Sequence, residues 1–317
     1  MTADVVIVSY NTRDLLRACL ASVFRYGGAP LRAVFVVDNA SGDGSAAMVQ
    51  SEFPAVRLIA LDENLGFGAA NNRAIRASAA EALLFLNPDA ELTQGALDAL
   101  LHCLEMHAQC VLVGPKLVYP GGRFQASCRR FPTPLRACWS LTGMEARFPE
   151  RCACLRNWLR EDEHRSGARV DMVSGACFLA RRDFVARVGG FDEECFLYEE
   201  ETDLMLPARK EGAGVRYCPE AVVVHHGGAS VAAAGLSVFS LRHLYRSKYY
   251  CFRKHYGLRA ARRAYRLDCA VLALSAARQR LRGSREAADR LREVRRAWRD
   301  SFTPISVLRA QADFRDS

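Results

Sequence analysis

The chain has 317 residues, half of them hydrophobic, and a formal net charge of +9 at pH 7. This length allows one large domain, or a domain with an appendage, with a full hydrophobic core. No apolar run is long enough to span a bilayer, and the twelve cysteines form no Cys-x-x-Cys pair, so neither a membrane-spanning protein nor a zinc or thioredoxin-like site is supported. We expect no signal peptide, and reduced, mostly buried thiols in the cytosol.

The first third of the chain alternates strand-like and helix-like patterns. Apolar runs predict strands over residues 5–8, 33–37, 56–61 and 82–86. Helical spacing predicts helices over residues 12–24, 68–79 and 93–107. We expect Thr93 to cap the last of these helices. Strands that alternate with helices are typical of a doubly wound parallel sheet.

From residue 111 the rhythm changes. The sequence predicts strands over residues 111–114, 116–119, 170–181 and 221–224. It predicts helices over residues 198–211 and 236–298. Residues 125–168 are rich in Arg, Cys and Pro, and we expect a long irregular loop there. A loop of that length inside a compact domain is usually functional or mobile.

A carboxylate follows the buried strand predicted over residues 82–86. The chain continues there as Asn87-Pro88-Asp89. In open parallel sheets, ligands bind outside the carboxyl ends of the strands. A hard oxygen donor at that edge suits Mg²⁺ or Mn²⁺ shared with substrate phosphates. Taken alone, such a motif is more often only the turn that Asx-Pro sequences favour.

Polar loops follow the first three strands. Ser9-Tyr10-Asn11 and the Asp-, Gly- and Ser-rich residues 38–45 lie where a nucleotide would bind. For the second loop, the alternative is a turn in which Asp43 or Ser45 caps the next helix. The third loop, residues 64–72, contains Gly-x-Gly at the start of a helix, which favours phosphate. It lacks the third Gly of a dinucleotide fingerprint, so a Rossmann dehydrogenase is poorly supported.

Four carboxylates lie within five residues, from Glu199 to Asp203. Crowding raises the pKa of a carboxyl group, which suits a general base. On a helix, Glu199 and Asp203 would share one face. The alternative is a solvated acidic helix start. The neighbouring Phe191, Phe196 and Leu197 favour partial burial instead.

A histidine pair, His225-His226, follows the strand predicted over residues 221–224, beside a Gly-rich loop. Neutral imidazole is a common metal ligand. One of these histidines, together with Asp89 and a diphosphate, would complete an octahedral metal site. The alternative is a pair of structural or exposed histidines.

Seven motifs occur in order within residues 3–256. They are Val6-Ile7-Val8-Ser9-Tyr10-Asn11, Val37-Asp38-Asn39-Ala40-Ser41, Asn64-Leu65-Gly66-Phe67-Gly68, Asn87-Pro88-Asp89, Gly189-Gly190-Phe191-Asp192, Glu200-Glu201-Thr202-Asp203 and His225-x-Gly-Gly-x-Ser. As a set they resemble family 2 glycosyltransferases, and within that family the rhamnosyltransferase-like branch of surface-polysaccharide assembly.

The resemblance implies a GT-A fold, that is, an α/β protein with a Rossmann-like, mostly parallel sheet flanked by helices. A GT-A domain would span residues 1–235. Its nucleotide-sugar-binding half would be residues 1–115 and its acceptor-binding half residues 116–235. A basic helical region would follow over residues 236–317.

The resemblance also implies roles for single residues. The nucleotide-sugar contacts would be Ser9, Tyr10, Asn11, Asp38, Asn39, Gly66, Asn71, Arg73, Asn87 and Asp89. Asp38 would pair with the base. Asp89 and His225 would hold Mg²⁺ or Mn²⁺. The acceptor contacts would be Gly175 and Asp203. Glu201 would be the catalytic base.

Three positions depart from the family pattern. Asn87 replaces the first Asp of the DxD motif, which removes one charge from the metal site. Glu201 stands where many relatives have Asp, so Glu200 remains a rival base. Pro207 stands where the family has a helical Arg, and because Pro interrupts helices we expect a disturbed helix after Asp203.

The function implied is inverting, metal-dependent transfer of a sugar, with rhamnose as the family-level expectation, from a nucleoside-diphosphate sugar. The acceptor would be a glycan or lipid-linked glycan in surface-polysaccharide assembly. A nucleotidyltransferase is one alternative, but the chain lacks a Gly-rich basic loop for a triphosphate near its start. A non-catalytic nucleotide-sugar-binding module on the same fold is the other.

The positive charge is concentrated near the end of the sequence. Residues 241–300 contain 18 Lys and Arg against 5 Asp and Glu, whereas the rest contains 26 against 30. The segment 241–250 interleaves basic and aromatic residues, which suits an anionic membrane surface. We therefore expect a peripheral protein at the cytoplasmic face of the membrane. No nucleic-acid-binding motif is present. The alternatives are a solvated basic face, or a helix that packs on the acceptor domain or on a second subunit of a homo-oligomer.

Overall fold

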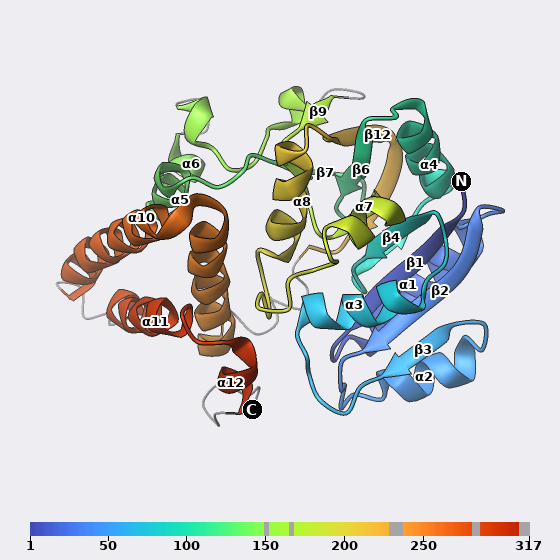
Figure 1. The fold of residues 1–317 in the computed structure, drawn as a ribbon, viewed down its shortest axis with the longest axis horizontal. Helices are drawn as coiled ribbons and strands as arrows, with labels where there is room; N and C mark the ends of the chain where they lie inside the picture. Colours follow the sequence, from blue (N-terminus) through green and yellow to red (C-terminus); the bar gives the residue numbers. More distant parts are fainter. Residues whose placement is uncertain (149–151, 165–167, 228–236, 281–285, 311–317) are drawn as a thin grey trace. The chain divides into compact units, whose positions relative to one another are not determined.

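The computed structural model describes residues 1–148, 152–164, 168–227, 237–280 and 286–310 (Figure 1). The chain divides into two compact units. Unit 1 consists of residues 1–129, 158–192 and 203–233, and unit 2 of residues 130–157, 193–202 and 234–317. The division expected between residues 115 and 116 stays a prediction, and the boundary expected at residue 235 lies outside the described residues.

Unit 1 is built on a mixed sheet. Within the described residues, ten strands take part, and the main path runs β3-β2-β1-β4-β11-β6-β12-β5. The strands of the first half are β1 (Ala3–Ser9), β2 (Leu31–Asp38), β3 (Arg57–Ala60) and β4 (Ala82–Leu86). All neighbouring pairs among these four are parallel. Their carboxyl ends therefore lie at one edge of the sheet, as the sequence predicted.

The second half of the sheet mixes directions. Its strands are β5 (Ala90–Leu92), β6 (Cys110–Val118), β11 (Cys177–Arg181) and β12 (Gly214–His225). β11 runs antiparallel between β4 and β6, β12 runs parallel to β6, and β5 runs antiparallel to β12. The short strands β7 (Phe124–Gln125) and β9 (Arg169–Val170) join the sides of β6 and β12.

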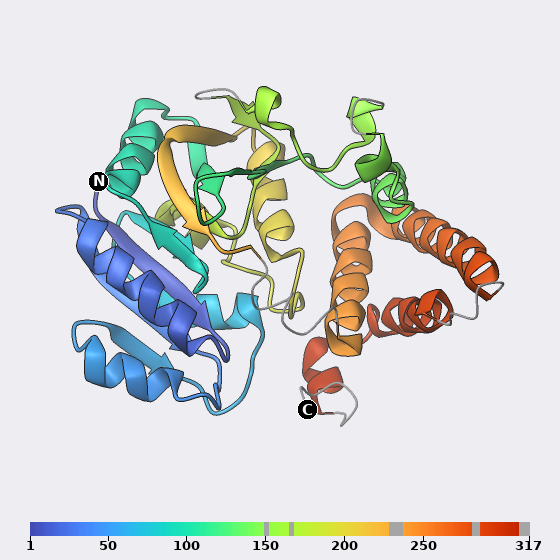
Figure 2. The ribbon, with the colours of Figure 1, turned by 180° about the vertical axis from the view of Figure 1, so that it is seen from behind.

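Helices cover both faces of the sheet of unit 1. They are α1 (Arg13–Tyr26), α2 (Ser45–Glu52), α3 (Phe67–Ala77), α4 (Ala96–Met106) and α7 (Arg182–Arg187). On one face, α1, α2 and α4 share a core with Val5 and Ile7 of β1 (Figure 2). On the other face, Phe85 of β4 packs edge-on against Phe191, which also meets Phe67 of α3. The two-sided helical cover confirms the predicted α/β fold class.

The observed elements correct several boundaries. α4 begins after its N-cap Gly95, which has a φ of 76°, and not after Thr93. The Thr93 hydroxyl instead donates a hydrogen bond to the carbonyl of Val222. The two strands predicted around Pro115 are one strand, because β12 forms a bulge opposite that proline. The strand predicted over residues 170–181 is divided into β9, β10 (Met172–Val173) and β11.

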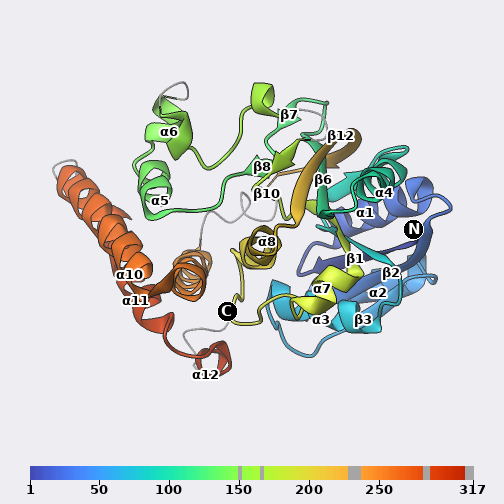
Figure 3. The same ribbon diagram turned by 45° about the horizontal axis from the view of Figure 1, so that its top comes forward.

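Unit 2 is mainly helical. It contains α5 (Pro134–Leu141), α6 (Met144–Arg147), α10 (Val238–Arg280), α11 (Glu286–Asp300) and α12 (Ile305–Arg309). α10 is kinked at Gly257, where φ is 83° and ψ is 166°. α11 lies along the limb of α10 that follows the kink (Figure 3). Tyr265 of α10 stacks on Trp298 of α11 with 4.7 Å between ring centroids.

The segment 125–168 is more regular than expected. Besides α5 and α6 it contains the strand β8 (Cys128–Arg129), which pairs with β10, and the 3₁₀ turns Ala153–Leu155 and Glu161–Glu163. α5 begins at a Pro in its first turn, and its N-cap, Thr133, accepts a hydrogen bond from the amide of Arg136. This Thr-Pro start was visible in the sequence.

The basic and aromatic segment 241–250 packs inside unit 2. Arg246 and Tyr249 are fully buried, and Arg242 and Tyr245 are nearly so. Lys248 pairs with the buried carboxylate of Asp268 at 2.7 Å. The charged side chains of this segment are therefore mostly engaged in contacts within unit 2. Among the described helices, none combines the length and the apolar character that a bilayer crossing needs.

Pro207 does not disturb its helix as expected. α8 runs from Glu200 to Lys210 with Pro207 inside it. After the proline, the amide of Glu211 still bonds to the carbonyl of Pro207. The helix therefore continues to Lys210, although Pro207 has no N–H to donate to the preceding turn.

Candidate active site

Two polar loops lie side by side where β1 and β2 end. Ser9 and Asp38 are register partners at the last position of these parallel strands. The backbone amide of Asn11 donates to the Ser41 hydroxyl at 2.9 Å, and the Asn11 side-chain oxygen accepts from the amide of Gly42 at 2.8 Å. Asn11 has a φ of 54°, a left-handed conformation that Asn tolerates better than most residues. The two loops therefore form one cross-linked rim.

Asp38 offers an unused acceptor inside this rim. Its side chain is 3% exposed. One carboxylate oxygen, Oδ2, accepts a hydrogen bond from the amide of Ser41 at 3.0 Å. The other, Oδ1, is buried and has no hydrogen-bond partner among the described residues. An unsatisfied buried acceptor costs about 1–3 kcal/mol, and more when it is charged, so a ligand that donates an N–H there would remove this cost.

The third loop is fastened to the second by Asn39. The side-chain nitrogen of Asn39 donates to the side-chain oxygen of Asn64 at 2.8 Å. The side-chain oxygen of Asn39 accepts from the backbone amide of Leu65, also at 2.8 Å. Gly66 follows and is the N-cap of α3. Its φ of 86° is a backbone conformation that residues with L side chains rarely adopt. The loops after β1, β2 and β3 therefore form one hydrogen-bonded rim.

The other predicted donor contacts have different surroundings. Ser9 is buried and shares a 2.9 Å hydrogen bond with the hydroxyl of Thr12. Tyr10 is half-buried at the end of β1. Asn71 is buried and donates to the carbonyl of Phe67, within its own helix. Arg73 is exposed on α3. Asp43, the alternative helix cap, accepts hydrogen bonds from the amide and the hydroxyl of Ser45.

Asp89 and His225 lie together although 136 positions separate them in the chain. Oδ1 of Asp89 lies 3.3 Å from Nε2 of His225. The short strand β5 causes this, because Ala90 pairs with His225 and the amide of His226 donates to the carbonyl of Asp89. Both side chains are largely buried, with 6% and 13% of their areas exposed.

The Asp89–His225 pair fits a divalent cation. Adjacent ligands of an octahedral Mg²⁺ or Mn²⁺ at about 2.1 Å are about 3 Å apart, close to the observed separation. Carboxylate and imidazole are also acceptable donors for Mn²⁺. Asn87 lies two residues before Asp89, and its backbone amide bonds to the carbonyl of Ala176 at 2.9 Å. Gly175, which was predicted to contact the sugar acceptor, precedes Ala176 in the turn before β11. This hydrogen bond therefore brings it beside the Asn87-Pro88-Asp89 loop.

Gln125 is a functional candidate that the sequence analysis missed. Its side-chain oxygen lies 3.1 Å from Nδ1 of His225 and accepts a hydrogen bond from it. In the neutral tautomer that has its proton on Nδ1, the ring donates to Gln125 and the lone pair of Nε2 is available for a cation beside Asp89. Such outer partners orient metal-binding histidines. The Pro120-Gly121-Gly122 turn is the signal that could have found it, because this turn returns β7 to the side of β6.

The candidate base residues follow a strained backbone. Tyr198 and Glu199 both have a φ of 68°, which is uncommon for residues with side chains. Each such residue costs on the order of 1 kcal/mol or more, and strain of this kind tends to occur at active sites. α8 begins immediately afterwards, with Glu200 as its first residue.

Glu200 and Glu201 differ in their surroundings. Glu200 is 3% exposed, and its Oε1 has no hydrogen-bond partner among the described residues. Burial, reinforced by the neighbouring Glu201, raises the pKa of Glu200 well above its usual range. Glu201 is half-buried and therefore more accessible to a substrate. Asp203, one turn further along α8, is buried.

Residues 194–197, which precede Tyr198 and Glu199, are held by contacts with α10 within unit 2. Arg246 of α10 bonds to the carboxylate of Glu194 at 2.8 Å and also to its carbonyl. Ser247 donates to the carbonyl of Leu197 at 2.9 Å. Phe196 stacks on His243 with 4.4 Å between centroids, and burial lowers the pKa of that histidine to about 3. Helix α10 therefore supports the approach to Glu200 and Glu201.

The chain is similar to known proteins in sequence and in fold. The chain matches the family described as "Glycosyl transferase family 2" over residues 4–189. It is 32% identical to the N-acetylglucosaminyl-diphospho-decaprenol L-rhamnosyltransferase of Mycobacterium tuberculosis over 253 residues, which are 75% of this chain and 80% of that protein. A match of this extent shows family membership.

Solved structures show the same fold. The mannosyltransferase PcManGT from Pyrobaculum calidifontis, in complex with GDP-Man and Mn²⁺, aligns with a TM-score of 0.50 at 17% identity, over 95% of this chain and 87% of that one. TarS 1–349 of S. aureus aligns with a TM-score of 0.51 at 15% identity, over 95% and 91%. This chain is a member of glycosyltransferase family 2, and it is a glycosyltransferase of the GT-A fold.

Proposed function

We propose that this chain transfers a sugar, with inversion, from a nucleoside-diphosphate sugar to a lipid-linked glycan during surface-polysaccharide assembly. The observation that carries the proposal is the Asp89–His225 pair at the carboxyl edge of the sheet. The similarity to an L-rhamnosyltransferase supports rhamnose as the sugar and a prenyl-diphosphate-linked N-acetylglucosamine as the acceptor. A lipid-linked acceptor also supports a location at the membrane surface.

The donor would lie against the rim formed by the loops after β1, β2 and β3. The free oxygen of Asp38 would accept the N–H of a uracil or thymine base. Ser9, Tyr10 and Asn11 would line the base pocket, and Asn39 and Gly66 would hold the rim in shape. Asn71 and Arg73 would lie near the ribose. The buried position of Asn71 gives it a supporting role in this arrangement.

The diphosphate would lie near Asn87, Asp89 and His225, with Gln125 holding the imidazole in the binding tautomer. Mg²⁺ or Mn²⁺, when bound, neutralises charge on the leaving diphosphate. Glu201 would take the proton from the acceptor hydroxyl, because it is the more accessible of the two glutamates, and Glu200 remains its rival. Gly175 and Asp203 would contact the acceptor.

The test is transfer from thymidine- and uridine-diphosphate sugars to a synthetic prenyl-diphosphate N-acetylglucosamine, in Mn²⁺ and in EDTA. Asp89→Asn should abolish transfer while leaving the melting temperature of the metal-free protein nearly unchanged. Glu201→Gln should cut transfer with little effect on donor binding. If Asp89→Asn keeps half of the wild-type rate, the metal assignment is wrong. If Glu200→Gln loses transfer and Glu201→Gln does not, Glu200 is the base.

A further inference from the structure

The limb of α10 that follows Gly257 exposes a basic face. Arg259, Arg262, Arg263 and Arg266 are all exposed. At 100° per residue, these four side chains lie on one side of the helix. No acidic side chain of the described residues pairs with any of them. Asp268, the nearest acid along the limb, is fully buried and paired with Lys248. The face therefore carries uncompensated positive charge.

The same face becomes apolar further along the limb. Ala270, Ala273, Leu274 and Ala277 are exposed on the side that carries the arginines. Leu274 is 65% exposed, although large apolar side chains are usually covered. With a rise of 1.5 Å per residue, the basic and the apolar zones are each about 10 Å long. We call this surface, residues 259–277, the α10 face.

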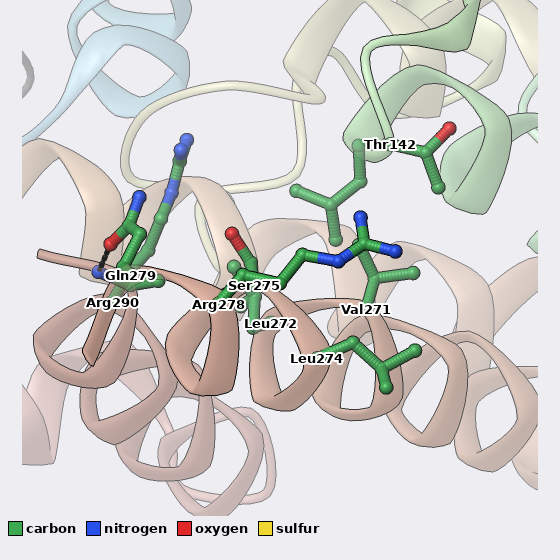
Figure 4. A pocket seen from close by; sticks show the side chains of 10 residues that line it. Thr142, Val271, Leu272, Leu274, Ser275, Arg278, Gln279 and Arg290 are labelled. Carbon is green, nitrogen blue, oxygen red and sulfur yellow. Dashed lines mark hydrogen bonds between the residues drawn. The ribbon is translucent and has the colours of Figure 1, made fainter. Parts of the chain in front are cut away.

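A cavity lies beside the apolar zone. It has a volume of about 260 Å³ and lies between the end of α5, the α10 limb and α11. Figure 4 shows Val271, Leu272 and Leu274 around it together with the side chains of Arg278 and Arg290. Nε of Arg290 is buried and has no hydrogen-bond partner among the described residues. Apolar walls beside guanidinium groups suit a ligand that joins an anionic group to a hydrocarbon chain.

We propose that the α10 face and this cavity dock the protein on a bilayer that contains anionic phospholipids. The arginines would contact lipid phosphates, and Leu274 and the cavity would receive hydrocarbon. This proposal deepens the proposed function and rests on it, because a lipid-linked acceptor lies in a membrane. It moves the docking surface away from residues 241–250, whose charged side chains are mostly buried.

The surface favours lipid over two other partners. A nucleic acid would use the arginines but would leave Leu274 and the apolar cavity without a role. A second copy of the chain would bring the same uncompensated basic face against itself, which charge repulsion disfavours. An anionic bilayer matches both zones, and surface-binding segments combine basic residues with exposed Leu in this way.

The test is co-sedimentation of the full chain with vesicles of phosphatidylcholine alone or mixed with phosphatidylglycerol. We expect binding only to the mixed vesicles, weakened by added salt because the arginine contacts are exposed. Each arginine near such a surface contributes roughly fivefold to partitioning, so Arg262→Glu with Arg266→Glu should weaken binding at least tenfold. Leu274→Glu should weaken it too.

Matched controls lie in unit 1. Met106 is 66% exposed, so Met106→Glu tests whether any exposed apolar residue gives the same loss. Arg25→Glu with Arg57→Glu reverses two exposed arginines elsewhere. Both controls should bind mixed vesicles like the wild type. Equal losses in the controls, or equal binding to both kinds of vesicle, would overturn the proposal.

Two further readouts separate this proposal from the proposed function. The α10-face variants should keep transfer to a short-chain, water-soluble acceptor and lose it to an acceptor embedded in mixed vesicles. Vesicle binding by a protein that transfers no sugar to either acceptor would leave the docking surface standing and refute the function. If an RNA oligonucleotide binds the wild type, and the arginine variants lose that binding but Leu274→Glu does not, the face belongs to nucleic acid.

Discussion

Replacing Arg246 should destabilise unit 2 more than any surface substitution. Its side chain is fully buried in the first limb of α10. It donates to the carboxylate of Glu194, to the carbonyl of the same residue, and to the carbonyls of Thr303 at 2.8 Å and Asp300 at 3.3 Å. The Glu194 carboxylate also accepts from the amide of Ile305 at 2.9 Å. One guanidinium therefore joins α10, the segment before Glu200, and the approach to α12.

The expected magnitude follows from the partners that would be abandoned. Arg246→Met keeps most of the side-chain volume but removes the hydrogen bonds that the guanidinium donates to the Glu194 carboxylate and to the carbonyls of Glu194, Asp300 and Thr303. Removing one partner of a buried ion pair costs about 3–5 kcal/mol. At roughly 3 °C per kcal/mol for a unit of this size, the melting temperature should fall by about 10 °C or more.

Differential scanning calorimetry of the wild type and of two variants checks this prediction. Arg292→Met is the matched control, because Arg292 is 68% exposed and its one ion pair within the described part of the chain is with Asp289 on the same helix. Such exposed pairs contribute about 1 kcal/mol or less. Below its melting temperature, Arg246→Met should also lose transfer rate, since Glu194 and Leu197 lead directly to Glu200. A melting temperature within about 2 °C of the wild type, or an equal fall in Arg292→Met, would refute the reasoning.

Three further predictions concern single side chains. The pKa of Glu200 in the folded state lies above its ordinary value of 4.5, because burial disfavours its charged form and the neighbouring Glu201 adds to this effect. The stability that protonated Glu200 contributes is therefore present below pH 4.5 and is lost as the pH rises towards the folded-state pKa. Glu200→Gln should therefore raise the melting temperature at neutral pH and flatten its pH dependence, and an unchanged profile would contradict this. Gln125→Leu removes the partner of His225 Nδ1, so Mn²⁺ affinity measured by calorimetry should fall roughly tenfold or more; unchanged affinity would remove Gln125 from the site. Asp38→Asn should weaken donor binding roughly tenfold while Mn²⁺ binding stays unchanged, and a loss of both would indicate a collapsed rim.

The rim formed by the loops after β1, β2 and β3 was predictable because it depends on local patterns. Apolar runs identified β1, β2 and β4, and parallel strands place their carboxyl ends together. Ser9 and Asp38 therefore had to be neighbours, and the register confirms it. The unpartnered oxygen of Asp38 was not predictable, because it depends on which backbone amides the folded loop supplies.

The Asp89–His225 pairing needed a contact that no local pattern carries. β5 is only three residues long, and its side-chain pattern is too short to predict a strand. Its antiparallel pairing with β12 nevertheless determines that Asp89 meets His225. The chemistry of the motifs indicated Asp89 and His225 as candidate ligands, whereas the distance between them depended on tertiary pairing.

The role of residues 241–250 was misjudged for a related reason. Alternating Arg and Tyr give the same sequence pattern on a membrane face and in a polar core. The deciding fact is the position of acidic partners, Asp268 and Asp300, which are 20 and 58 positions from the residues they bind. Burial of Arg246 shows that basic character in the sequence does not by itself indicate exposure.

The central claim is that the carboxyl edge of the sheet binds a nucleoside-diphosphate sugar with a divalent cation. The most direct measurement is a thermal-shift screen of such donors, with Mn²⁺ or Mg²⁺ and with EDTA, on the wild type and Asp89→Asn. A ligand that binds the native state raises the melting temperature by mass action. We predict a metal-dependent rise with a thymidine- or uridine-diphosphate sugar that Asp89→Asn loses. The absence of a shift with every donor, or a shift that is the same in EDTA and in the variant, would contradict the account.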